Sequence, residues 1–148
     1  MALRGMPLPK PDLDTQAFWD GCTEERFLLP RCGACGAFRW PPGPMCPECR
    51  ATETEWVQAS GRGSVYSWVV VTHPVAEQLV DQVPYVVGLI ELEEGVRVVG
   101  NVGGCPPEAV EAGLPVELYF TQVEDVRLPN FRVRQGGEPW PISAATQR

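Results

Sequence analysis

The sequence predicts a mainly β protein in which a short helical segment and a cysteine-rich ribbon precede a small closed barrel. Glycine (15) and proline (16) make up about a fifth of the 148 residues, which favours short strands and many turns over long helices. Four of the six cysteines lie in two closely spaced pairs, as is typical of a metal-binding ribbon. The segments that follow are rich in β-branched and aromatic residues, as strands are.

Composition and charge exclude several classes of protein. Hydrophobic residues make up 44% and charged residues 21% of the chain, which is enough to form an ordinary core. The formal net charge of −7 gives no general attraction to nucleic acid phosphates or anionic lipid. No apolar run approaches the roughly 20 residues of a membrane helix, and the N-terminus lacks an apolar stretch of signal-peptide length. We therefore expect a cytoplasmic protein whose cysteines are metal ligands or free thiols.

The N-terminal residues divide into an arm and a helix. Residues 1–11 are proline-rich, and we expect them to be extended. Residues 12–27 have a weak helical pattern, in which Asp12 or Asp14 is a candidate N-cap and Gly21 is expected to interrupt the helix.

Phe18 and Trp19 are adjacent in this helical segment. A lone helix cannot bury two neighbouring side chains on one narrow stripe. One can pack on its own chain while the other meets a partner protein, and purely internal packing of both is the alternative. We name Phe18 and Trp19 as candidate partner contacts.

The ribbon is defined by the segment CGACGAFRWPPGPMCPEC, in which ten residues separate two CxxC pairs. Two such pairs can hold four thiolates around one Zn²⁺ at about 2.3 Å each. Four thiolates leave no open coordination position, so we expect a structural zinc in a rubredoxin-like ribbon. A disulfide pair and an iron centre of rubredoxin type are the alternatives. The expected ligands are Cys32, Cys35, Cys46 and Cys49.

Strand patterns dominate the chain after the ribbon. A short helical turn over residues 105–113 interrupts them, and Gly88 is expected at a bulge or bend. Several short strands with glycine bends and one short helix favour a closed barrel of the OB-fold type, with an open sandwich as the alternative. The expected strands are residues 55–61, 63–71, 85–95, 96–102, 115–125 and 128–134.

These patterns predict four units along the chain. They are an N-terminal arm and helical docking segment (1–30), a zinc ribbon (31–53), an OB-fold (54–135) and a flexible tail (136–148).

No catalytic constellation is evident in the sequence. The single histidine, His73, lies beside a proline, and no second residue completes a nucleophile–base pair with it. Cys22 and Cys105 lie apart from the ribbon and have no activating neighbour in sequence. We therefore expect a protein that is not an enzyme on its own.

Three arginines near the C-terminal end surround Phe131. Arginine side chains suit phosphates or carboxylates, so an anionic ligand such as the phosphates of coenzyme A is one interpretation. A solvated strand edge is the alternative. We name Phe131, Arg132 and Arg134 as candidate coenzyme A-binding residues.

Several motifs in order resemble one family over residues 12–134. They are the FW pair, RCGACG with PP before CPEC, GRGSVYSWVVVTHP, PYVVGLIELEEGVRVVGNV and LPNFR. The cysteines combined with PYVVGLIELEEG are similar to the zinc-ribbon and OB-fold accessory proteins of acyl-CoA metabolism, formerly a domain of unknown function.

The resemblance implies a non-catalytic subunit in lipid metabolism. Members of this family dock on thiolase-fold enzymes, which are thiolases or thiolase-like retro-aldolases, and some partner a thiolase-like aldolase or a hydratase in steroid side-chain degradation. The resemblance implies that the partner supplies the nucleophile or base, while this chain supplies a docking surface and part of the site for the acyl-CoA thioester. A single-stranded nucleic-acid-binding OB module is the alternative function, which the acidic charge disfavours.

Overall fold

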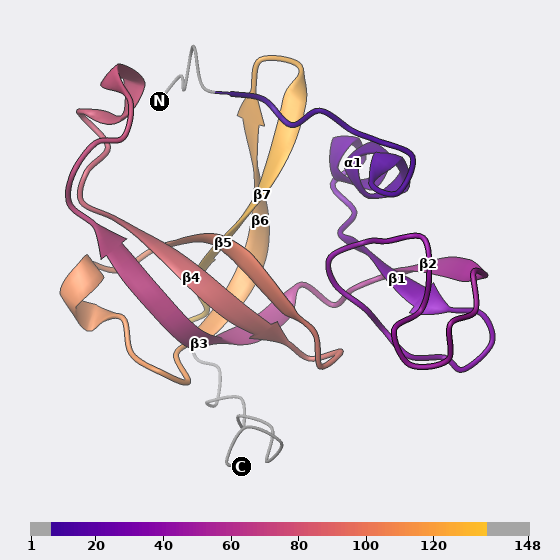
Figure 1. Cartoon of the computed structure of the whole chain (residues 1–148). Helices are drawn as coiled ribbons and strands as arrows, with labels where there is room; N and C mark the ends of the chain where they lie inside the picture. Colours follow the sequence, from indigo (N-terminus) through magenta and orange to yellow (C-terminus); the bar gives the residue numbers. More distant parts are fainter. Residues whose placement is uncertain (1–6, 136–148) are drawn as a thin grey trace.

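A computed structural model describes residues 7–135 of the chain (Figure 1). One α-helix comes first, a two-stranded sheet follows, and five further strands close into a barrel. The predicted mainly β fold with an N-terminal helix and a C-terminal barrel is therefore confirmed. The predicted tail over residues 136–148 and the first six residues of the predicted arm lie outside the described residues.

The helix α1 (Gln16–Thr23) is shorter than the sequence predicted. Asp12 organises the turn before it, because its Oδ1 accepts hydrogen bonds from the backbone N–H and the hydroxyl of Thr15, at 2.9 and 2.7 Å. The prediction that Gly21 interrupts the helix is wrong, since Gly21 lies inside it and is buried. Within the described residues, no helix has the length and apolar character that crossing a membrane requires.

The ribbon contains the two-stranded sheet, in which β1 (Leu28–Cys32) pairs antiparallel with β2 (Thr54–Gln58). Cys32 is opposite Thr54 at the end of this hairpin. The expected strand over residues 55–61 therefore belongs to the ribbon sheet rather than to the barrel. The sequence did not predict β1, because its five residues include a proline and prolines seldom occur inside strands.

The barrel closes in the strand order β3-β4-β5-β7-β6, with β3 also paired to β6. Its one parallel pairing joins β5 to β7, and the five strands match the small Greek-key barrel of the OB-fold, so that prediction is confirmed. The strands are β3 (Arg62–Val71), β4 (Tyr85–Leu92), β5 (Arg97–Gly103), β6 (Pro115–Val123) and β7 (Val126–Val133).

Two 3₁₀ turns, η1 (Glu77–Leu79) and η2 (Pro107–Ala109), lie in the connections between barrel strands. The second falls within the predicted helical turn over residues 105–113. The irregularity of the sheet lies on β3 between Val65 and Ser67, and not at Gly88 as predicted. Gly88 pairs regularly, but a Cβ there would lie 2.7 Å from the Val102 side chain, so close packing explains this glycine.

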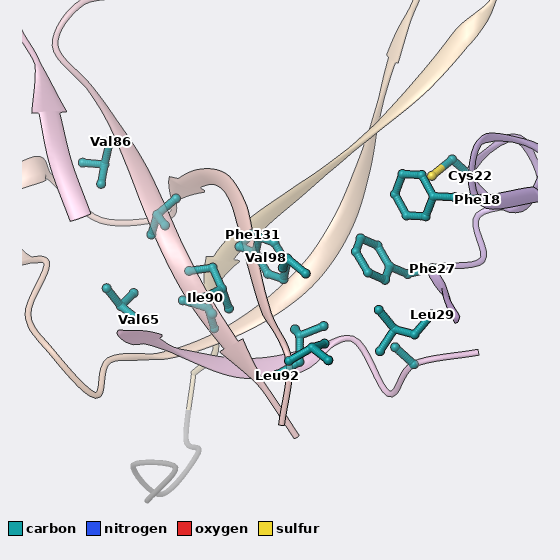
Figure 2. Close-up of a cluster of buried hydrophobic side chains, with 14 of the residues drawn as sticks. Phe18, Cys22, Phe27, Leu29, Val65, Val86, Ile90, Leu92, Val98 and Phe131 are labelled. Carbon is teal, nitrogen blue, oxygen red and sulfur yellow. The ribbon is translucent and has the colours of Figure 1, made fainter. Parts of the chain in front are cut away.

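One hydrophobic core runs from the barrel to the helix (Figure 2). Inside the barrel, Ile90, Val98 and Phe131 are fully buried. Figure 2 shows Phe18 and Phe27 reaching from the side of the helix and ribbon toward Val98 and Phe131. Burial of apolar surface therefore holds the ribbon, helix and barrel together as one body.

Candidate functional site

The two cysteine pairs lie on turns that are built alike. The backbone N–H of Gly36 donates to the carbonyl of Cys32, and the N–H of Arg50 donates to the carbonyl of Cys46, each at 2.9 Å. Gly36 (φ 74°) and Arg50 (φ 65°) both have left-handed backbone conformations. Each turn therefore folds back sharply and returns its second cysteine toward the first.

The four cysteine sulfurs form one cluster, with all of them within 4.8 Å of one another. Cys32 Sγ lies 3.6 Å from Cys49 Sγ, and Cys35 Sγ lies 3.7 Å from Cys46 Sγ. A tetrahedral zinc with bonds of about 2.3 Å requires sulfurs about 3.8 Å apart. A disulfide requires about 2.05 Å, so the cysteines fit a metal and not the disulfide alternative.

Backbone amides favour thiolates at two of the ligands. Hydrogen bonds from the backbone N–H groups of Cys35 and Ala34 lower the pKa of Cys32 to about 6. The N–H of Cys49 lowers the pKa of Cys46 in the same way. Amide donors aimed at sulfur stabilise the charged form that binds metal.

At the other two ligands, Cys35 and Cys49, the surroundings raise the pKa and disfavour the thiolate. The backbone N–H of Ala37 lowers the pKa of Cys35, but hydrogen bonding to the neighbouring thiols and burial outweigh it and raise that pKa to about 12. The pKa of Cys49 is also raised, although the N–H of Ala51 opposes the rise. A divalent cation held by the four cysteines would favour the thiolate form of each of them, which is the form that binds a structural metal.

Arg39 is a buried side chain of the ribbon that the sequence did not single out. It is 6% exposed, and its Nη2 donates to the carbonyl of Gly43 at 3.1 Å and to the hydroxyl of Thr54. Gly43 lies in the loop between the cysteine pairs, and Thr54 lies opposite Cys32. The guanidinium therefore ties that loop to the ribbon hairpin.

A cavity of about 330 Å³ lies between the ribbon side and the barrel. Its barrel wall is formed by residues 98–101 of β5 and 128–131 of β7. Two amides, Asn101 and Asn130, are the polar side chains of the wall, and Asn130 Nδ2 donates to Thr121 Oγ1 at 3.0 Å.

The opposite wall of the cavity is aromatic and consists of Phe18, Trp19, Phe27 and Trp40. Such a cavity suits a narrow, mostly apolar group with a few hydrogen-bonding atoms.

The two candidate partner contacts differ in exposure. Phe18 is 5% exposed and packs edge-on against Phe27 and Trp40, with ring centroids 5.1 and 4.9 Å away. Trp19 is only half-buried and meets Phe18 at 5.0 Å. Phe18 is therefore committed to the core of this chain, whereas Trp19 keeps surface for another molecule.

The three candidate coenzyme A-binding residues do not form one cluster. Phe131 is 1% exposed and contributes to the cavity wall from inside the barrel. Its neighbour Arg132 points to the other face of the strand, where its Nε lies 2.9 Å from a carboxylate oxygen of Glu117. Arg134 Nε is buried without a hydrogen-bond partner among the described residues. Arg132 is therefore paired with a carboxylate, and coenzyme A binding by these three residues stays a prediction.

The fold and the cysteine cluster define a class of protein, a zinc ribbon joined to an OB-fold barrel. Two family models agree with this division. The rubredoxin-like zinc ribbon domain of ChsH2 matches residues 19–55, and the C-terminal OB-fold domain of ChsH2 matches residues 56–121. The chain belongs to the ChsH2 family of zinc-ribbon and OB-fold proteins, also called DUF35 proteins.

Some known relatives have names from acyl-CoA metabolism, and others are named as DUF35 domain-containing scaffold proteins. A probable enoyl-CoA hydratase alpha subunit of Thermomonospora curvata is 40% identical over 84% of this chain, but the chain spans only 39% of that relative's length. The benzoylsuccinyl-CoA thiolase subunit BbsA of Thauera aromatica is 34% identical over 66% of this chain and 65% of its own length. A solved structure, the Ltp2-ChsH2(DUF35) aldolase, has a chain 38% identical to this one, with a TM-score of 0.79 and coverage of 85% and 98%.

Proposed function

We propose that this chain is a non-catalytic accessory subunit that docks on a thiolase-fold enzyme and helps to hold an acyl-CoA thioester. The likeness to a chain of the Ltp2-ChsH2(DUF35) aldolase carries the proposal, because it extends over 98% of that chain. The relative named as a thiolase subunit supports the same kind of partner. The partner is a thiolase or a thiolase-like retro-aldolase, and degradation of a steroid side chain is the pathway we favour.

The chemistry of the described residues favours the role of an accessory subunit over that of a catalyst. A zinc ion held by the four cysteine thiolates would stabilise the ribbon and would have no open site for a reacting water. Burial raises the pKa of the Cys22 thiol to about 12, which keeps it a poor nucleophile. Bond making therefore takes place on the partner, which supplies the nucleophile or base.

We place the narrow chain of coenzyme A that carries the acyl group in the cavity of about 330 Å³, which we call the aromatic cavity. Its walls are mostly apolar, and Asn101 and Asn130 offer amide groups to a ligand that itself carries amides. Phe131 enters this proposal as a buried part of the wall, and Arg132 does not enter it. Enlarging the cavity with Trp19→Ala should weaken coenzyme A binding by the complex several-fold, as titration calorimetry would measure.

The experiment that tests the proposal is co-expression with a thiolase-like enzyme from the same organism. We expect the two chains to elute together in gel filtration, and the thioester activity of the enzyme to fall when this chain is omitted. Separate elution together with unchanged activity would disprove the accessory role. Turnover of a thioester by this chain alone would disprove the non-catalytic part.

The nucleic-acid alternative needs aromatic rings free to stack on bases and cations free to meet phosphates. On the outer face of the barrel, the Arg97 guanidinium covers the ring of Tyr66, with 3.8 Å between the Cζ atom and the ring centroid. Arg97 also forms an ion pair with Glu91 at 3.0 Å. Micromolar binding of an oligothymidine that weakens steeply with salt would favour the alternative.

A further inference from the structure

Exposed apolar side chains gather on one side of the barrel. Among residues 7–135, seven large hydrophobic side chains are exposed, and five of them lie on β3, on β5 or in the connection between β3 and β4. Monomeric proteins seldom leave such side chains together without a partner. The five are Val69, Val70, Val75, Val80 and Val99.

The strand register brings part of this set onto one outward face. Val69 is opposite Val87, and Leu89 is opposite Val99, while Val87 and Leu89 are two residues apart on β4. Directly opposite and alternate residues share a face of the sheet. We call Val69, Val87, Leu89 and Val99 the apolar face.

The apolar face is shallow and free of charge. A hollow of about 180 Å³ lies over Gly88, and its lining residues include the four members of the apolar face together with Ser67 and Trp68. None of these side chains is charged, although the chain as a whole carries a net charge of −7. A closed barrel has no free strand edge here, so an occupant must meet the face with side chains rather than by adding a strand.

The borders of the apolar face indicate the chemistry of its occupant. At one end, Glu91 and Arg97 neutralise each other in an ion pair. Beyond the other end lies the connection between β3 and β4, residues 72–84, which has exposed acidic side chains at Glu77 and Asp81 and no lysine or arginine. A second copy would bring two such acidic borders and two chains of charge −7 together, so a different protein with basic side chains fits better.

The apolar face also adjoins the aromatic cavity. Val99 is a member of the face and a wall residue of the cavity. Figure 1 shows the connection between β3 and β4 on the side of the barrel away from the ribbon. A partner seated on the face would therefore lie beside the cavity without contacting the zinc site.

We propose that the thiolase-fold partner docks on this apolar face through an apolar surface bordered by basic side chains that meet Glu77 and Asp81. This inference rests on the proposed function and specifies which surface performs it. It also places the partner next to the cavity proposed for the acyl-CoA thioester, so that a ligand held there is within reach of both chains.

The test introduces a charge onto the face without disturbing the fold. Val69→Glu and Val99→Glu change side chains that are 61% and 69% exposed, so zinc content and melting temperature should stay at wild-type values. The matched control is Ala112→Glu, which introduces the same charge at an exposed apolar residue outside the apolar face and outside the predicted docking segment. Surface plasmon resonance with the immobilised thiolase-like subunit measures the affinity of each chain.

We expect each face variant to bind at least about tenfold more weakly, because an unpaired charge is desolvated in the interface. Ala112→Glu should bind within about twofold of wild type, and Glu77→Lys should reduce the affinity most at low salt. Wild-type affinity of both face variants would overturn the inference and leave the proposed function standing. Failure of the wild-type chain to bind would overturn both. A dimer of the isolated chain that Val69→Glu dissociates would assign the face to a second copy instead.

Discussion

Gly21 lies inside α1 at a place where the chain that follows the helix packs closely against it. A Cβ at this position would lie 2.8 Å from the carbonyl oxygen of Arg26 and 2.8 Å from Leu28 Cγ. Alanine favours a helix over glycine by about 1 kcal/mol, but the overlap with backbone cannot be relieved by a rotamer change. We expect Gly21→Ala to lower the free energy of unfolding by about 1–2 kcal/mol net, as measured by urea denaturation.

Gly43→Ala is the matched control for this prediction. No heavy atom lies within 4 Å of the position that its Cβ would occupy. The free energy of unfolding should therefore change by less than about 0.5 kcal/mol. Equal stability of the two variants would show that the backbone near Gly21 can move aside.

Single residues also show which parts of a site a sequence can predict. The metal ligands were predictable because a CxxC spacing itself contains the turn that brings two sulfurs together, and the structure confirms the cluster. The coenzyme A-binding residues stay a prediction. Their surroundings could not be read from the sequence, because adjacent strand residues point to opposite faces and the Arg132 partner, Glu117, comes from another strand. The buried Arg39 carried only the weak signal of a cation between two aromatic residues, Phe38 and Trp40.

At the level of elements, the barrel strands were easier to predict than the ribbon strands. Long runs of β-branched residues mark β3 and β4, and turns with glycine separate most of the others. The ribbon sheet pairs Leu29 with Val57, which is 28 positions further along the chain, and a local pattern says nothing about such pairing.

The ribbon is the element whose stability depends on metal. Cys32→Ser removes one of four ligands, so the variant should lose its zinc and the order of the β1–β2 hairpin. Binding of a structural zinc contributes on the order of 10–16 kcal/mol in model fingers. We expect about one zinc per chain in the wild type and none in the variant, with a red shift of tryptophan fluorescence as Trp40 and Trp56 meet water.

Cys105→Ser is the control for zinc loss, because Cys105 lies outside the cluster. It should keep both the metal and the wild-type fluorescence. A wild-type chain that contains no metal yet shows the same fluorescence would contradict a structural zinc.

For the molecule as a whole, Phe18 joins the helix and ribbon to the barrel. Its ring contacts three other aromatic rings at centroid distances of 4.9–5.1 Å. Phe18→Ala should lower the free energy of unfolding by about 3–5 kcal/mol, which is the usual cost of deleting a buried aromatic ring. Hydrogen exchange should then show lost protection in α1 and β1, while β3 and β4 keep theirs.

Trp19→Ala provides the comparison, because Trp19 is half-buried and should affect exchange in α1 only slightly. Uniform loss of protection in Phe18→Ala would instead mean that the barrel unfolds together with the helix and ribbon.

The short crossing from the ribbon to the barrel is hydrogen-bonded at each of its three residues. Ala59 N–H donates to Phe27 O, Ser60 N–H donates to Glu94 Oε1, and Gly61 O accepts from Leu118 N–H, at 2.8, 2.6 and 2.7 Å. A linker held by these hydrogen bonds keeps the ribbon in a fixed orientation relative to the barrel. An enzyme that binds the barrel would therefore also fix the orientation of the cysteine ribbon. Little conformational entropy would be lost on binding, because the two parts do not move relative to each other beforehand.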